Sequence, residues 1–217
     1  MPDPRNKMDK IKAKYKNLDR LFIKSLLVAV LLFALSLALN YFASAYATAR
    51  AGAPVGDIIL DNIPVFDLDW LFAYGPIIFW AIIAIFLLKE PQTIPFTIKS
   101  IALFVVVRSI FVTLTHLGVS PADLPPDFAS NFIKRLSYGG DLFFSGHAGM
   151  PFLMALVFWH NKYLRIFCIF SAVFFGAIVL MVHMHYSIDV LAAFFITYTI
   201  HHLAETFFLE DRKIFYV

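Results

Sequence analysis

The sequence predicts an all-α, polytopic membrane protein, built as a bundle of six transmembrane helices. Of its 217 residues 60% are hydrophobic and only 15% are charged, and the mean hydropathy is +0.77. These values lie outside the range of soluble globular domains. The charged residues are also unevenly placed, and they leave apolar runs long enough to cross the hydrocarbon core of a bilayer.

The basic N-terminal segment and the first apolar run form the start of the predicted bundle. Residues 1–24 hold eight Lys and Arg side chains, and residues 25–49 contain no charged side chain. This run is long enough for one tilted crossing, so we expect a retained helix there. Its last residues, ASAYATA, contain A-x-A patterns, which leaves cleavage by a signal peptidase as an alternative. The basic cluster is typical of a membrane orientation signal rather than of a nucleic-acid patch.

Five further apolar runs complete the six predicted helices: residues 70–88, 96–117, 142–161, 166–184 and 186–209. A Pro-rich link at residues 118–140 separates the third run from the fourth. We therefore expect one six-helix membrane domain at residues 25–209, followed by a short tail at residues 210–217.

A polar link at residues 50–69 separates the first two predicted helices. It carries four aspartates, at positions 57, 61, 67 and 69. Together with Trp70 and Tyr74 they could attract a cationic head group. We interpret the link instead as a solvated acidic loop, which is the commoner role of such a charge run.

The distribution of basic residues predicts the orientation of the chain in the membrane. Fourteen Lys and Arg residues would lie on the side of the two termini and three on the opposite side. Basic residues accumulate on the cytoplasmic side, so we expect both termini in the cytoplasm. Most of the aspartates would lie on the other side, which is the exterior, the periplasm or a lumen.

Two histidine motifs are the candidate functional site. The first reads GGDLFFSGHAG and contains His147, and the second reads HMHYSID and contains His185. The apolar run between them is long enough for two crossings joined by a turn near Asn161 and Lys162. Both histidines should therefore return to the same side of the bilayer, opposite the termini.

His185 and Asp189 have the spacing of side chains on one face of a helix. The carboxylate can accept the imidazole N–H, which fixes the tautomer and leaves the other ring nitrogen basic and nucleophilic. The alternative is a structural hydrogen bond that satisfies two polar groups at a helix start.

His147 is expected at the start of the fourth helix, with Ser145 as its N-cap. The N–H groups of the first turn, beginning at Gly146, would then be available to an anion such as phosphate. Arg108 is the third unusual residue, because a guanidinium inside a membrane helix is costly unless it faces water, a carboxylate or an anion. Pairing with Asp141 or Asp189 is its structural alternative.

The two motifs together resemble those of the type 2 phosphatidic acid phosphatase (PAP2) superfamily, particularly its sphingomyelin synthase-like branch. In that branch the motifs read approximately CGD-x-x-FSGHT and HYTIDV. The resemblance is strong over residues 139–197, weaker around Arg108 and Thr113, and absent in the N-terminal tail. It agrees with a six-helix fold and an externally facing site.

The resemblance implies a catalytic domain that forms a phosphohistidine at His185, with Asp189 as its orienting partner. His147 would be the acid that protonates the leaving oxygen, and no metal or other cofactor is required. The implied partners are a phospholipid donor and a lipid alcohol acceptor such as ceramide or diacylglycerol, without nucleic acid. The oligomeric state is not predicted.

Departures from the family pattern concern the group that binds the phosphate. The chain has no K-x6-RP motif, Val179 stands where the phosphatase branch has Arg, and His183 stands where the synthase branch has Arg. The remaining candidates for binding substrate are Arg108, Asp141, Ser145, Gly146 and His183.

Other functions stay open at this point. Water in place of the alcohol would make the same site a lipid phosphatase or a phospholipase C-like hydrolase. The set His147, His183, His185 and Asp189 has spacings compatible with metal ligands. Ser145 could serve an intramembrane protease. A transporter or structural protein could use Arg108 and the histidines as a polar interhelical network.

Overall fold

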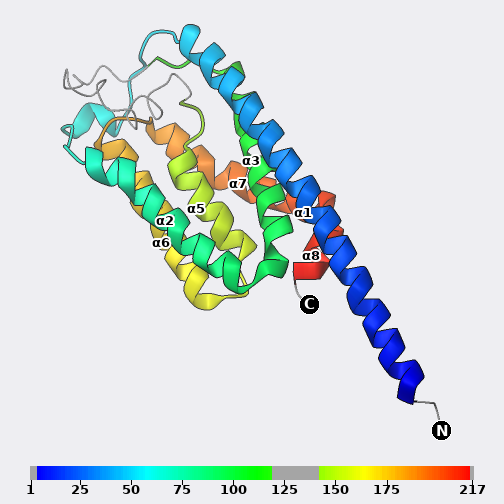
Figure 1. Ribbon diagram of the computed structural model, residues 1–217. Helices are drawn as coiled ribbons and strands as arrows, with labels where there is room; N and C mark the ends of the chain where they lie inside the picture. Colours follow the sequence, from blue (N-terminus) through cyan, green and yellow to red (C-terminus); the bar gives the residue numbers. More distant parts are fainter. Residues whose placement is uncertain (1–3, 119–141, 216–217) are drawn as a thin grey trace.

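The computed structural model describes residues 4–118 and 142–215, and all regular structure in this part of the chain is helical (Figure 1). The prediction of an all-α protein is thereby confirmed. The elements, in chain order, are α1 (Pro4–Ala49), η1 (Leu60–Asn62), α2 (Asp69–Lys89), η2 (Pro91–Thr93), α3 (Ile94–Leu114), α5 (Gly146–Val157), α6 (Lys162–Met181), α7 (Ser187–Phe207) and α8 (Leu209–Phe215).

Five segments are long and apolar enough to cross a membrane: Arg20–Ala49, Asp69–Lys89, Pro91–Leu114, Lys162–Met181 and Ser187–Phe207. The chain is therefore an integral membrane protein by the length and composition of its helices. The predicted count of six spans is not confirmed, because the fourth predicted helix is too short.

The fourth predicted helix, residues 142–161, is helical only over Gly146–Val157, which is α5. Twelve residues of α-helix extend about 18 Å, whereas a hydrocarbon core is about 30 Å thick. Ser145 caps the N-terminus of α5. After α5 the chain turns, and Asn161 caps the N-terminus of α6 by accepting a 3.1 Å hydrogen bond from the Leu164 N–H. These caps shorten α5, which packs against α6 and α7 inside the bundle.

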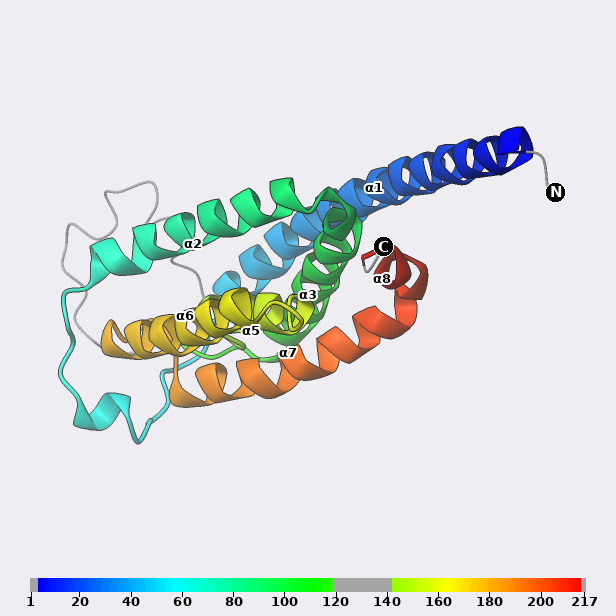
Figure 2. The ribbon, with the colours of Figure 1, turned by 90° about the horizontal axis from the view of Figure 1, so that it is seen from below.

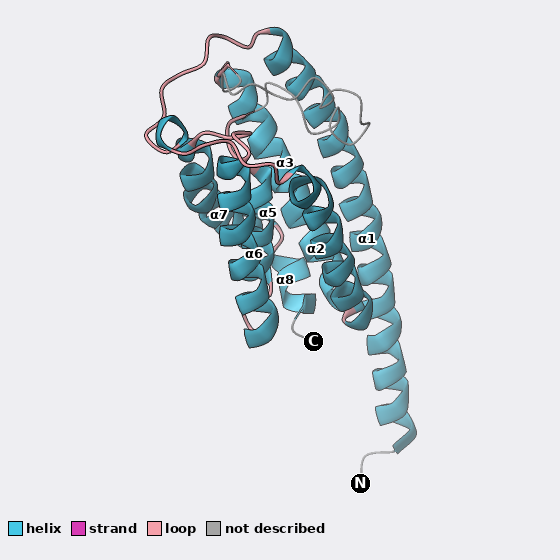
Figure 3. Cartoon of the chain, turned by 90° about the vertical axis from the view of Figure 1, so that its left-hand side faces the viewer, coloured by secondary structure: helices cyan, strands magenta, loops and turns pink. Residues whose placement is uncertain are grey.

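The first helix is longer than predicted and begins at Pro4, within the basic segment. No Gly or Pro interrupts residues 5–49, and Lys, Arg, Leu and Ala are good helix formers, so the helix continues through the polar residues. The backbone of α1 extends past the other helices at its N-terminal end (Figure 2). Toward its other end α1 packs along α3 and forms an outer wall of the bundle (Figure 3).

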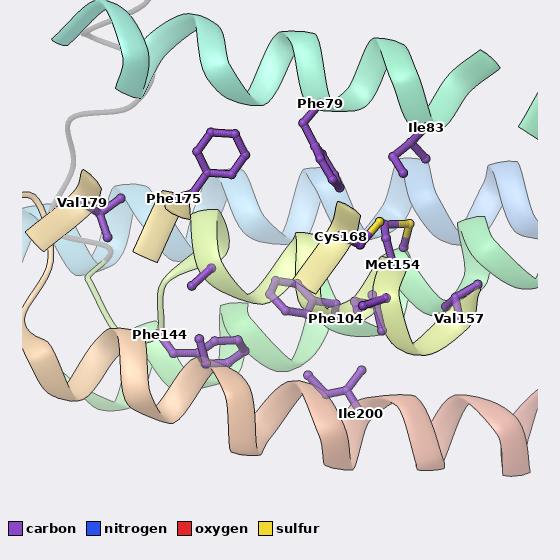
Figure 4. Packing of buried hydrophobic residues seen from close by; sticks show 14 of the residues in the cluster. Phe79, Ile83, Phe104, Phe144, Met154, Val157, Cys168, Phe175, Val179 and Ile200 are labelled. Carbon is purple, nitrogen blue, oxygen red and sulfur yellow. The ribbon is translucent and has the colours of Figure 1, made fainter. Parts of the chain in front are cut away.

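The apolar core lies between α2, α3, α5, α6 and α7. Phe79 and Ile83 point from α2 toward α5 and α6, and Ile200 points from α7 into the same layer (Figure 4). Met154 and Cys168 lie at its centre and are fully buried. This core fixes the relative positions of α5 and α7, on which the two histidine motifs depend.

A buried charged cluster attaches α8 to the end of the bundle nearer the termini. Lys99 Nζ lies 2.6 Å from the carboxylate of Asp211, and the Ser25 hydroxyl also donates to that carboxylate. Arg212 donates to the backbone carbonyl of Val157 at 3.1 Å. The cluster therefore joins α1, α3, α5 and α8.

Candidate active site

The two histidine motifs meet through a backbone hydrogen bond. The N–H of Ser145 donates to the carbonyl of Asp189 at 3.1 Å, which joins the start of α5 to the first turn of α7. Ser145 is fully buried, and its hydroxyl accepts the Ala148 N–H at 3.5 Å, so the predicted N-cap is confirmed. As a result His147 and His185 lie at the same end of the bundle.

His185 and Asp189 are in contact, as their spacing predicts. The imidazole Nδ1 lies 3.3 Å from Asp189 Oδ2, and both side chains are buried. The same oxygen accepts the Tyr186 N–H at 2.9 Å, at the N-terminus of α7, where the helix dipole favours a negative charge. With Nδ1 held by the carboxylate, Nε2 is the ring nitrogen left for chemistry.

One cavity of about 330 Å³ contains both histidines and Arg108 in its lining. Gly146 also lines it, so the start of α5 is exposed to the cavity. The other walls are mainly apolar and come from several helices: Leu37 of α1, Phe72, Phe79 and Trp80 of α2, Phe104 of α3, and Phe175 of α6. The cavity thus combines a cationic and basic end with walls that suit acyl chains.

The rings and cations of the site are held by specific contacts. The His147 ring stacks on Phe72, with centroids 4.5 Å apart and planes inclined by 23°. Arg108 Nε donates to the Phe144 carbonyl at 2.9 Å. A Cβ built on Gly146 would lie 3.9 Å from the same Nε, so the guanidinium is beside the first turn of α5. This arrangement brings a fixed cation next to backbone amides that suit an anion.

Ser145 and His183, two other residues named from the sequence, are not among the residues that line the cavity. Ser145 is enclosed beneath the start of α5. His183 is buried in the turn between α6 and α7 with φ of 56°, and its Nε2 has no hydrogen-bond partner in the described part of the chain. Asp141 lies outside the described residues, so its pairing with Arg108 stays a prediction.

The sequence did not indicate Asp57 as a site residue. The prediction that its link is a solvated acidic loop is wrong for this residue. It is buried, and one of its carboxylate oxygens accepts both the N–H of Ser187 at 2.7 Å and the hydroxyl of Ser187 at 2.8 Å. The other oxygen accepts the N–H groups of Ile59 at 2.8 Å and Leu60 at 3.1 Å. Burial alone would raise the pKa of Asp57, but these hydrogen bonds outweigh it and hold its pKa below the ordinary value.

Tyr186 makes a second connection between the polar link and the start of α7. Its hydroxyl donates to the Gly118 carbonyl at 2.9 Å and accepts the Val55 N–H at 3.2 Å. Asp57 and Tyr186 therefore hold the chain at Ser187 and Tyr186, the two residues directly after His185. Nothing in the local sequence distinguished Asp57 from the exposed Asp61 and Asp67.

The described residues contain no group of three or more His, Cys, Asp or Glu side chains arranged to hold a metal ion. The metal-site alternative therefore gains no support from this part of the chain. Ser145 is engaged as a helix cap, and the protease alternative gains none either.

The fold and the site define a class: an all-helical membrane protein with paired histidines facing one cavity of mainly apolar walls. Residues 139–206 match the family model described as PAP2 superfamily C-terminal. This stretch of the chain is therefore similar to the PAP2 superfamily, whose members are generally enzymes such as phosphatases and phosphotransferases. The match covers both histidine motifs, α5, α6 and nearly all of α7, and it leaves outside α8 and α1 to α3, with Arg108. Neither the curated proteins nor the solved structures provide a match.

Proposed function

We propose that the protein transfers a phosphate-containing head group from a phospholipid to a lipid alcohol such as ceramide or diacylglycerol. The observation that carries this proposal is that His147, His185 and Arg108 line a single cavity whose other walls are mainly apolar. A phospholipid matches such a cavity, because its phosphate suits the polar end and its chains suit the walls. The sphingomyelin synthase-like branch is proposed from the motifs around the two histidines.

The first chemical step forms a phosphohistidine. Nε2 of His185 attacks phosphorus, an N–P bond forms, and the P–O bond to the diacylglycerol oxygen breaks. His147 gives its proton to that oxygen, so that the alcohol leaves neutral. Asp189 stabilises the positive charge that develops on the His185 ring, and Arg108 with the Gly146 amide stabilises the phosphoryl oxygens.

The second step transfers the head group to the acceptor. His147, now neutral, takes the proton of the acceptor hydroxyl while its oxygen attacks phosphorus. The new P–O bond forms, the N–P bond breaks, and His185 returns to its starting state. If water takes the place of the lipid alcohol, the same steps give a lipid phosphatase or phospholipase C-like hydrolase. The apolar walls favour a lipid alcohol over water.

We propose further that both termini lie in the cytoplasm and that the site faces the opposite side. The support is the excess of Lys and Arg on the side of the termini. The start of α1 and α8 also lie toward the same end of the bundle (Figure 1).

The test uses purified protein in detergent with phospholipids labelled in the head group, with and without ceramide or diacylglycerol, followed by product analysis. We expect label on the acceptor lipid, an acid-labile phosphoramidate on the wild type, and no turnover by His185→Ala. His202→Ala is the matched control, because His202 is exposed on α7, the helix that follows His185, and does not line the cavity. Release of a water-soluble product at a rate independent of acceptor would establish hydrolysis instead. Full activity of His185→Ala would remove the proposed nucleophile.

A further inference from the structure

Asn40 is a polar side chain in the cavity wall contributed by α1. It belongs to the span Arg20–Ala49, whose other residue in the cavity lining is Leu37. An amide in the hydrocarbon region is costly unless its donors and acceptor are satisfied. A polar residue at this position therefore needs a partner.

The protein supplies Asn40 with only one weak contact. The Ser109 hydroxyl lies 3.5 Å from Asn40 Oδ1, but its single proton is better placed on the Val105 carbonyl, at 2.8 Å. The Asn40 amide nitrogen has no hydrogen-bond partner in the part of the chain that the structure describes. Even with the amide oxygen and nitrogen exchanged, Ser109 accepts at most one of the two N–H groups. At least one donor is left for a ligand.

We propose that Asn40 donates a hydrogen bond to the acyl carbonyl of the lipid substrate and makes the site selective for acyl over alkyl lipids. The carbonyl is either the ester of a glycerolipid or the amide of a sphingolipid. This inference rests on the proposed function for the phosphate end of the same substrate.

The order of contacts along the cavity matches the order of groups in such a lipid. Gly146 lies beside Arg108, which precedes Ser109 in α3, and Ser109 contacts Asn40. Asn40 would therefore lie near a phosphate bound at Arg108. In a phospholipid the first acyl carbonyls are likewise only a few bonds away from phosphorus. Leu37 also lines the cavity and precedes Asn40 in α1 by about one helical turn, in the direction away from the start of α5 (Figure 1), where the acyl chain follows.

The test measures binding without turnover. Immobilised His185→Ala protein in detergent is titrated with three labelled lipids that share one head group: a diacyl glycerophospholipid, an N-acyl sphingophospholipid and a dialkyl ether phospholipid. We expect the two acyl lipids to bind about 3- to 10-fold more tightly than the ether lipid, as one hydrogen bond provides. Adding Asn40→Leu should abolish this preference, and the ether lipid should bind as before.

A further variant keeps the inference falsifiable. Leu37→Ala is the matched control on the same wall. It should weaken the binding of all three lipids alike and keep the preference for acyl lipids. A parent protein that binds acyl and ether lipids equally, or an Asn40→Leu protein that still prefers acyl lipids, would overturn the inference. Acyl-selective binding without turnover of any phospholipid by the wild type would instead count against the proposed function alone.

Discussion

Asp57 offers the sharpest test of how the site is held, because it reaches the start of α7 from a distant loop. In Asp57→Asn only one acceptor oxygen remains, so either Ser187 or the Ile59 and Leu60 pair loses its acceptor. A hydrogen bond to a charged group contributes about 1.5–3 kcal/mol. Two bonds that share one oxygen are not additive, and we expect a loss of about 2–4 kcal/mol in the free energy of unfolding.

The same change should lower turnover, because Ser187 lies two residues after His185. A displacement of about 1 Å in a reacting group can reduce rate about 100-fold, and we expect a fall in kcat of about 10- to 100-fold with little change in KM. Unfolding in detergent and phospholipid turnover are measured on the same protein. Asp67→Asn is the control, since Asp67 is exposed in the same link. Wild-type stability and turnover in Asp57→Asn would refute the positioning role.

The stability difference between wild type and Asp57→Asn should also depend on pH. The pKa of Asp57 is lowered by folding, so its ionised form stabilises the native state. This stabilisation is complete above the ordinary pKa of about 4 and is lost as pH falls through the lower folded value. Unfolding measured from pH 7 downward should show a constant difference to about pH 4 and a shrinking one below it. A difference that already shrinks between pH 7 and 5 would contradict this account.

The remaining predictions concern the cavity and the opposite end of the bundle. His147→Ala should suppress turnover of a phospholipid far more than that of a nitrophenyl phosphodiester, because a nitrophenolate leaves without a proton; equal losses would assign His147 to binding or folding. Arg108→Lys should keep the charge but lose the forked donors, lowering turnover by about 10- to 1000-fold, and an undiminished rate in a stable protein would exclude the forked clamp. Lys99→Ala should destabilise the protein by about 3–5 kcal/mol, because it leaves the Asp211 carboxylate buried and unpaired. Lys99→Met combined with Asp211→Leu should recover most of that loss in thermal unfolding, and no recovery would show that the pair is not the source of the effect.

The sequence alone determined that the protein is helical, that His185 contacts Asp189 and that Ser145 caps a helix. Charge-free runs predict membrane helices because a spanning segment must satisfy its backbone internally and expose apolar side chains to lipid. The contact between His185 and Asp189 was predictable because the two residues are only four positions apart at the start of α7. Ser145 as a cap was predictable for the same local reason.

Tertiary structure alone decided which distant residues complete the site. The length of α5 depends on caps and on burial against α6 and α7, and hydropathy does not distinguish a buried short helix from a membrane span. Asp57 resembles its acidic neighbours in sequence, and only the return of the loop to Ser187 makes it a buried acceptor. Asn40 and Arg108 share a cavity only because α1 packs along α3. Local spacing determines contacts within one helix, whereas contacts between helices depend on packing, which is a property of the whole chain.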